Sequence, residues 1–156
     1  MAKALVIYYS RSGNTRKMAE AVAGSLKKEG IETVLKDVLD VSVDELAGFQ
    51  AIVIGSPTYY GTMSAEIKKL FDDSVKLHGK LDGKIGAAFS SSANLAGGNE
   101  TTVLDILKAM LIHGMIIQGD PQGDHYGPAA IGAPDDRSLK ECARLGLRLA
   151  KLLKKQ

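Results

Sequence analysis

Short apolar runs alternate along the chain with segments in which apolar residues recur every three or four positions. Four of the runs are rich in Val, Ile and Ala and are apolar at successive positions, which is typical of strands buried on both faces of a sheet. They span Ala4–Tyr9, Ala51–Gly55, Ile85–Phe89 and Met115–Gln118, and a fifth, alternating run spans Thr33–Val38. These five runs are the predicted strands.

The segments between the strands have the periodicity of amphipathic helices. Their apolar positions are Met18, Val22 and Leu26; Ile67, Leu70, Phe71 and Leu77; Val103, Ile106, Leu107 and Met110; and Leu139, Cys142, Gly146, Leu149 and Leu153. The second connection, Leu39–Phe49, has room for a brief helix at most. Strands that alternate with helices form right-handed βαβ units, so we expect a three-layer α/β fold with a parallel sheet.

Length and charge narrow the possible functions. The 156 residues are enough for a single domain, 1–156, that removes roughly 70% of its unfolded surface from water. A count of 20 basic against 18 acidic side chains gives a net charge of +2, which gives little support to a nucleic-acid partner.

The cysteine count and the uncharged stretches bear on the compartment. The lone Cys142 excludes a disulfide framework and an iron–sulfur array, and it favours a reducing, cytoplasmic compartment. The opening apolar run is too short for a signal peptide. The longest uncharged stretch, Ala47–Ala65, contains Gln50, Pro57 and several Gly, Ser and Thr residues, so we expect no membrane span.

Glycine and proline gather where the predicted strands end. All four prolines fall there, as do nine of the 17 glycines: Gly13, Gly55, Gly61, Gly97, Gly98, Gly119, Gly123, Gly127 and Gly132. In open parallel sheets, ligands bind in a crevice at the carboxyl ends of the strands. The sequence therefore predicts a ligand site at this edge.

The first strand leads directly into a loop suited to a phosphate. Its residues are Ser10, Arg11, Ser12, Gly13, Asn14 and Thr15, with the first helix following at once. Backbone N–H groups at a helix start attract anions, and hydroxyls can donate further hydrogen bonds. The alternative is a simple helix cap at Asn14 or Thr15, but three hydroxyls and a glycine exceed that need. The chain has no GxxxxGK[ST] and no GxGxxG after this strand.

These residues carry a family resemblance. The run Ile7-Tyr8-Tyr9-Ser10 followed by Gly13, Thr15, Ala19 and Val22 resembles the FMN-phosphate signature of flavodoxins. Four later segments are similar to the WrbA-type NAD(P)H:quinone oxidoreductases: Gly55–Ser64, Phe89–Ser92 with Gly97–Thr101, His113–Ile117 and Tyr126–Ala129. The resemblance implies a flavodoxin-like, five-stranded parallel sheet in the order 2-1-3-4-5, with FMN across its carboxyl edge.

The resemblance also assigns residues to the cofactor. Ser10, Arg11, Ser12, Gly13, Asn14 and Thr15 would hold the ribityl phosphate; Pro57, Thr58, Tyr59, Tyr60 and Gly61 would flank the flavin ring; and Ser91, Ser92, Ala93, Asn94 and Gly97 would form a third contact loop. From the residues themselves, Pro57 is expected to end the third strand, and the two tyrosines beyond it would offer apolar faces to a flat ring. The alternative is that both tyrosines belong to the core.

The chain departs from the family pattern in several places. The family has two histidines, of which the first lies against the flavin. This chain has Ile112-His113 there, so His113 inherits only the second position and is a candidate cofactor residue by resemblance alone. A lone histidine at a helix end is otherwise a partner of the helix dipole. His78 stands where the family commonly has a tryptophan, and the insertion that helps WrbA tetramers assemble is missing from 39–49. Cys142 is expected to be a packing group.

Three functions follow as hypotheses. The first is an FMN-dependent enzyme that transfers two electrons from NAD(P)H to a quinone-type acceptor, with no catalytic side chain. The second is a one-electron carrier that docks on redox partners, and the third is a binding module without flavin. The resemblance also implies a homo-oligomer, at least a dimer, whose neighbouring chain walls part of the pocket. An apolar rim of Tyr59, Tyr60, Met63 and the Gly119–Pro134 loop would support it.

Overall fold

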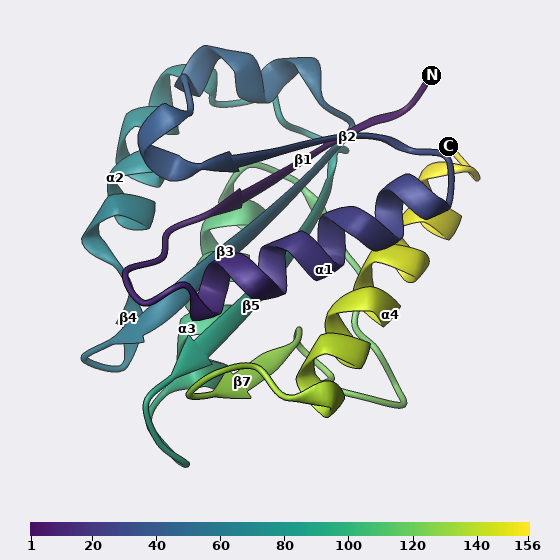
Figure 1. The fold of residues 1–156 in the computed structure, drawn as a ribbon. Helices are drawn as coiled ribbons and strands as arrows, with labels where there is room; N and C mark the ends of the chain where they lie inside the picture. Colours follow the sequence, from purple (N-terminus) through teal and green to yellow (C-terminus); the bar gives the residue numbers. More distant parts are fainter.

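A mainly parallel sheet runs through the middle of the molecule, and helices cover both of its faces (Figure 1). The structure is a computed structural model that describes residues 1–156. The strands are β1 (Lys3–Tyr8), β2 (Glu32–Asp37), β3 (Ala51–Tyr59), β4 (Thr62–Met63), β5 (Ile85–Ser92), β6 (Ile116–Ile117) and β7 (Ala129–Ile131). The α-helices are α1 (Asn14–Lys28), α2 (Ala65–Asp73), α3 (Asn99–Ile112) and α4 (Asp136–Leu153). Short 3-10 turns occupy Val38–Asp40, Val43–Gly48 and Ser74–Leu77.

The predicted fold is confirmed in its layers and in the order of its main strands. The hydrogen-bonded order is β2-β1-β3-β5-β6, all parallel, which is the order 2-1-3-4-5 when the main strands are counted along the chain. Between β1 and β3 the chain reverses its direction of travel across the sheet, and such a switch point opens a crevice at the carboxyl edge.

The predicted count of five strands is too low, because two short strands join the sheet. Strand β4 returns antiparallel along the end of β3. Strand β7 pairs with the carboxyl half of β5, while β6 pairs with its first two residues. The fifth strand position is thus divided between β6 and β7 by an excursion of the chain through 118–128.

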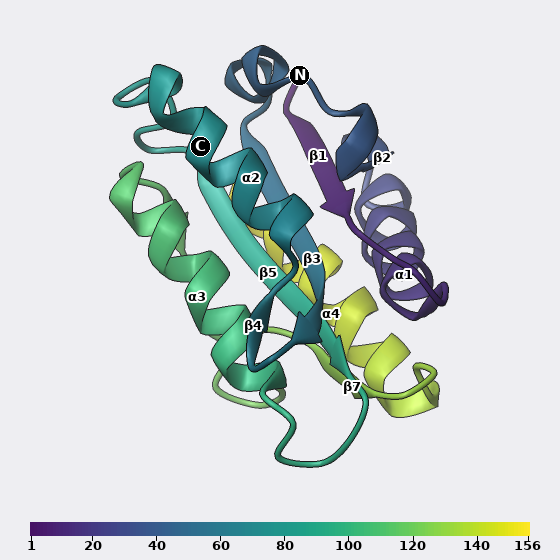
Figure 2. The same ribbon diagram turned by 90° about the vertical axis from the view of Figure 1, so that its left-hand side faces the viewer.

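Successive residues of the strands supply two separate cores, as the pleat requires. In β1, Ala4 and Val6 face the layer of α1 and α4, whereas Leu5 and Ile7 face the layer of α2 and α3. Figure 2 shows α2 and α3 in front of the sheet, with α1 and α4 on the other side. The predicted helical periodicities are therefore the faces that the helices bury.

Pro57 does not end the third strand, contrary to the expectation from sequence. Strand β3 continues to Tyr59, and Pro57 pairs with Ser91 of β5. Strand β1 ends at Tyr8, opposite Gly55, so β3 has no main-strand neighbour on that side at Pro57. Proline is tolerated where its missing N–H faces an open edge, and the strand can therefore run through it.

None of the helices combines the length with the hydropathy that crossing a membrane requires.

Candidate cofactor site at the carboxyl edge of the sheet

The loop after β1 leaves the start of α1 open to a ligand. The N-cap is Gly13, at a φ of 92°, and no side chain caps the helix, so the alternative of an Asn14 or Thr15 cap is wrong. The first helical hydrogen bond runs from Lys17 N to Gly13 O. The N–H groups of the first turn therefore have no helical acceptor. The first turn also holds no acidic residue.

The remaining geometry of this loop suits an anion. The Gly13 N–H donates to Ser10 Oγ over 3.1 Å, which closes the turn. A Cβ at Gly13 would meet nothing within 4 Å, so glycine is needed there for its positive φ and not for space. Arg11 and Ser12 are exposed beside it. Unpaired N–H groups, hydroxyls and the positive end of the helix dipole together fit a phosphate.

Thr15 links this first loop to the third. Its side chain is 1% exposed, and its hydroxyl lies 3.0 Å from Ser91 Oγ at the end of β5. The structure thus brings together two residues that are 76 positions apart. The hydroxyl pair fixes the start of α1 against the strand that carries the third loop.

The second loop is a tight hairpin that presents two tyrosines. Tyr59 pairs with Thr62, and the two residues between them, Tyr60 and Gly61, have positive φ of 49° and 81°. Positive φ at both central positions is the pattern of a type I′ turn. Tyr60 is fully exposed and Tyr59 is half-buried, so the alternative that both belong to the core is wrong.

Tyr59 is placed by neighbours from the first loop. Its ring meets that of Tyr9 edge to face, with centroids 6.4 Å apart, and the Arg11 guanidinium lies 6.0 Å from its centroid. Burial and the nearby carboxylate of Glu66 raise the pKa of Tyr9, which keeps that phenol neutral. From the sequence, Tyr9 was expected only to end the first strand, although Tyr8, Tyr9 and Ser10 form a run of side chains that end in hydroxyls.

The third loop is folded on its own polar groups. Ser92 Oγ donates to Asn94 O over 3.2 Å and accepts from Asn99 Nδ2 over 3.1 Å. Gly97 N donates to Asn94 O, and a Cβ at Gly97 would lie 2.7 Å from that oxygen. Ala93 and Asn94 are exposed. The loop therefore presents its backbone at the same edge as the first two loops.

His113 lies elsewhere. It is the C-cap of α3, whose first residues adjoin the second and third loops; at 1.5 Å per residue a helix of this length separates its ends by about 20 Å. Within one chain, the structure therefore separates His113 from the loops that are expected to hold the cofactor. Its Nε2 lies 2.7 Å from Ser74 Oγ, and its ring lies 6.3 Å from that of His78. Burial first, and then His78, lowers the pKa of His113, which does not favour a cationic partner of the helix dipole.

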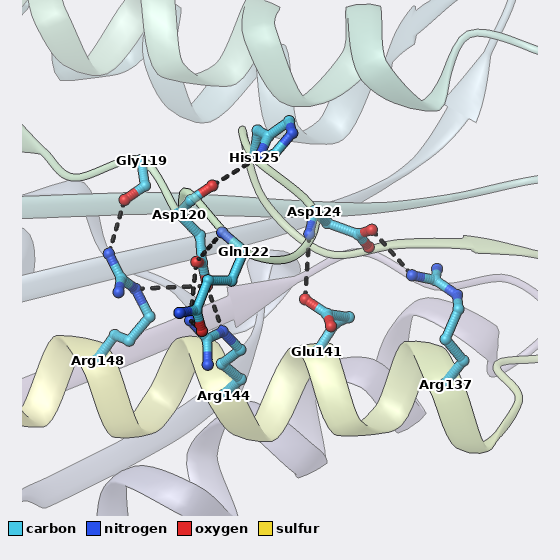
Figure 3. A network of polar contacts seen from close by, with 9 residues as sticks. All are labelled: Gly119, Asp120, Gln122, Asp124, His125, Arg137, Glu141, Arg144 and Arg148. Carbon is cyan, nitrogen blue, oxygen red and sulfur yellow. Dashed lines mark hydrogen bonds and ion pairs between the residues drawn. The ribbon is translucent and has the colours of Figure 1, made fainter.

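The excursion at 118–128 is bound to α4 by charges (Figure 3). Arg144 donates two hydrogen bonds to the carboxylate of Asp120, from Nε to Oδ2 and from Nη2 to Oδ1 over 2.9 Å. Arg148 donates to Gly119 O over 2.7 Å. Arg137 pairs with Asp124 at 2.9 Å. The Arg144 hydrogen bonds hold the pKa of Asp120 well below its usual range.

The expected apolar rim is correct only in part. The Gly119–Pro134 loop, one of its expected parts, is held by ion pairs, and Met63 is buried at 8% exposure. Tyr60 is the exposed aromatic of the second loop, and Ile131, at 48%, is exposed at the end of β7. Buried Cys142, at 0% exposure, is a packing group as expected.

Comparison with known proteins decides the family. Residues 5–110 match the family model described as the flavodoxin domain. The chain belongs to the flavodoxin family. It is similar to a flavodoxin of Aquifex aeolicus, with 43% identity over 96% of this chain and 86% of that one. It is similar over 99% of both chains to an NAD(P)H dehydrogenase (quinone) of Archaeoglobus fulgidus, with 35% identity.

A solved structure agrees with this placement. The flavodoxin, WrbA-like protein from Agrobacterium tumefaciens superimposes with a TM-score of 0.82 at 29% identity, over 99% of both chains. Membership of the family implies that FMN is the cofactor. The uncapped start of α1, the glycine at positive φ and the three converging loops fit that group.

Proposed function

We propose that this flavodoxin-family protein is an FMN-dependent oxidoreductase that transfers two electrons from NAD(P)H to a quinone-type acceptor. The observation that carries the proposal is the open, uncapped start of α1 beside the ring of Tyr59 at the switch point of the sheet. The relative of Archaeoglobus fulgidus named for this activity aligns with nearly the whole chain. The lone, buried Cys142 is consistent with a reducing, cytoplasmic compartment.

Each loop has a distinct task in this proposal. Backbone N–H groups of Asn14 and Thr15, with the hydroxyls of Ser10 and Ser12, bind the phosphate. The second loop, Pro57–Gly61, flanks the flavin ring with its two tyrosines. The third loop, with Ser91, Ser92, Ala93, Asn94 and Gly97, offers backbone donors to the polar side of the ring.

The redox chemistry belongs to the cofactor. Bound FMN accepts and returns electrons in pairs, and the protein supplies binding, orientation and electrostatics. His113 lies at the far end of α3 beside His78, and His125 lies in the excursion, so no histidine is among the three loops. Arg11, 6.0 Å from the centroid of the Tyr59 ring, adds a positive charge beside the second loop. The proposed reaction needs no acid or base from a side chain, because the cofactor carries the electron transfer.

An anaerobic titration tests the enzyme proposal. The purified protein should carry yellow FMN whose visible absorbance is bleached by NADH or NADPH and restored by a quinone. A protein that holds FMN but is bleached by neither nucleotide would not be this enzyme.

A one-electron carrier is the second candidate. The observation in its favour is the 43% identity with the flavodoxin of Aquifex aeolicus. Absorbance during stepwise photoreduction separates the two: a carrier passes through two resolved one-electron steps, whereas the enzyme is reduced in a single two-electron step.

We also propose a homo-oligomer, at least a dimer, in which a neighbouring chain walls part of the substrate pocket. A surface hollow of about 470 Å³ lies between α2 and α3, beside the exposed side chains of Val75 (72%) and Ile112 (74%). His78 and His113 line the same hollow, so either histidine could approach a flavin only in another chain. Light scattering on a size-exclusion column tests the assembly, and turnover per flavin across a dilution series tests the shared pocket. A monomer with undiminished quinone reduction would refute both.

A further inference from the structure

The first turn of α3 is bonded directly to the second loop. The hydroxyl of Thr101 lies 2.5 Å from Gly61 O, in the exposed turn of the hairpin. The hydroxyl of Thr102, a fully buried side chain, lies 3.0 Å from Thr58 Oγ1, just before the two tyrosines. Two adjacent side chains of one helix therefore hold both ends of the segment that presents Tyr59 and Tyr60.

The same two hydroxyls also lie within hydrogen-bond distance of the third loop, and Thr101 shares its single hydroxyl proton between Gly61 O and Gly98 O. Thr101 Oγ1 lies 2.9 Å and Thr102 Oγ1 lies 2.8 Å from Gly98 O, where that loop ends. Gly98 has a φ of 103°, and a Cβ there would lie 2.8 Å from Gly61 Cα. The two loops thus touch glycine to glycine, and the threonines bind the backbone on both sides of the contact.

Two further hydrogen bonds extend this arrangement. Thr58 Oγ1 lies 3.0 Å from Ser90 Oγ, so the side chain of Thr58 is fixed between α3 and β5. One helical turn beyond the threonines, Asp105 accepts a 2.6 Å hydrogen bond from Thr62 Oγ1 in β4. The polar face of α3 therefore follows the hairpin from one strand to the other.

A local role in the helix accounts for only half of these contacts. Threonine hydroxyls often bond to a backbone carbonyl three or four residues earlier in a helix, and the bonds to Gly98 O satisfy that habit. The approaches to Gly61 and Thr58 cross to a different loop. Strand β4 has only two residues, so the ladder of the hairpin itself provides little to hold its tip.

We propose that Thr101 and Thr102 are positioning residues that fix the separation of the second and third loops and so preorganise the slot for the flavin ring. The inference rests on the cofactor site described above. A slot already held at the correct width loses less conformational freedom when the cofactor binds, which strengthens binding without a new contact to it. Neither threonine is required to touch FMN.

Valine variants test this, because Thr→Val keeps the shape and removes the hydroxyl. We expect Thr101→Val and Thr102→Val each to raise the Kd for FMN about fivefold, the fold-change that corresponds to one ordinary hydrogen bond. Thr101→Ser and Thr102→Ser should restore the native Kd. Thr33→Val is the matched control: Thr33 Oγ1 donates to Ile31 O over 2.9 Å at the opposite edge of the sheet, so its loss should leave the Kd unchanged.

Thermal unfolding of the apoprotein separates positioning from folding. Thr101 is exposed, so Thr101→Val should leave the Tm of the apoprotein near the native value while the Kd rises, and this variant decides the question if Thr102→Val fails to fold. A native Kd in Thr101→Val, or serine variants that bind no better than the valine variants, would overturn the proposal. Failure of NAD(P)H to reduce the native protein would overturn the enzyme proposal and leave this one standing.

Discussion

Two polar segments of the chain have similar compositions but use their hydrogen-bonding groups differently. Both the first loop, Ser10–Thr15, and the excursion 118–128, which links β6 to β7 in the last strand position, contain glycine and several polar side chains. In the first loop no side chain caps the helix, and the N–H groups of the first turn have no helical acceptor. In the excursion, Asp120 and Asp124 are paired with arginines of α4, and backbone groups are bonded to the same helix (Figure 3).

This difference shows that a segment rich in polar residues is not by itself a binding site. A segment whose hydrogen-bonding groups are already paired within the protein stabilises the fold, whereas a loop with unpaired groups can bind a ligand with them. The excursion fixes β7 beside β5, and the first loop is proposed to bind the phosphate. Changes to the excursion should therefore affect unfolding, and changes to the first loop should affect FMN.

The largest effect is expected from Asp120→Ala. Its carboxylate is 13% exposed and neutralises Arg144 and Arg148, so its removal leaves two arginines poorly paired. We expect the free energy of unfolding to fall by about 2–3 kcal/mol, within the range for hydrogen bonds to charged groups, because the bonds from Arg144 are lost; urea denaturation of the apoprotein measures it. The Kd for FMN, measured below the unfolding transition, should change less than twofold. A much larger loss of affinity would contradict the assignment of a purely stabilising role to the excursion.

The reverse result is expected from the first loop. Ser10→Ala should weaken FMN binding by about 1–3 kcal/mol, the range for hydrogen bonds to a charged group, as measured by quenching of flavin fluorescence. Thr15→Ala should weaken it by about 1 kcal/mol, the contribution of an ordinary hydrogen bond, because the start of α1 loses its bond to Ser91 Oγ. Both variants leave Gly13 and Asn14 unchanged, so the backbone conformation and the N–H groups at the start of α1 are retained. Unchanged affinity in both variants would remove this loop from the phosphate site.

The sequence predicted the open loop better than the closed one, for physical reasons. The first loop is local, so its chemistry can be read from six consecutive residues. The contacts of the excursion join it to charged positions 137, 141, 144 and 148 of α4. Their helical spacing is visible in the sequence, but their partners are not.

Two further features of the site, the Thr15–Ser91 hydroxyl pair and strand β4, could not be predicted from the sequence. The Thr15 and Ser91 hydroxyls meet only once the parallel strands are in register. The hairpin tip, Tyr60-Gly61, lacks the Asn-Gly or Asp-Gly pair that usually marks a type I′ turn, so β4 was not expected. By contrast, the order of the main strands could be predicted from the family resemblance, and the buried faces of the helices could be predicted from the periodicity of their apolar residues.

The second loop should respond through the flavin ring. Tyr59→Ala and Tyr60→Ala should each change the affinity for FMN by about 1 kcal/mol, as expected for one aromatic contact, or shift the absorption of the bound flavin. Tyr59→Phe keeps the ring that Tyr9 and Arg11 contact and should behave as the native protein does. Native spectra and affinity in both alanine variants would place the ring elsewhere.

A pH effect is expected away from the cofactor loops, at His113. Burial and His78 lower its folded pKa, so the unfolded chain binds the proton more readily than the folded chain. Stability is therefore fully present above the ordinary histidine pKa of about 6.5 and is lost as pH falls below it. Denaturation between pH 7.5 and 5, roughly spanning that value, should show this slope in the native protein and a smaller one in His113→Ala. FMN affinity of His113→Ala should change less than that of Tyr59→Ala.

The smallest effect is expected at Cys142, which packs in the core between the sheet and the layer of α1 and α4. The thiol is fully buried, and burial is the main cause that raises its pKa to about 12, so it stays protonated and cannot act as a thiolate nucleophile near neutral pH. Cys142→Ser should therefore retain FMN and turn over at the native rate, with at most a loss of stability from placing a hydroxyl in the core. Turnover with NADH and a quinone, divided by the flavin content, is the measurement. If the variant kept FMN and lost turnover, a side chain would be taking part in a reaction that the cofactor is expected to carry alone. Helix α4 would then contribute to the reaction as well as to the core and to the ion pairs with the excursion.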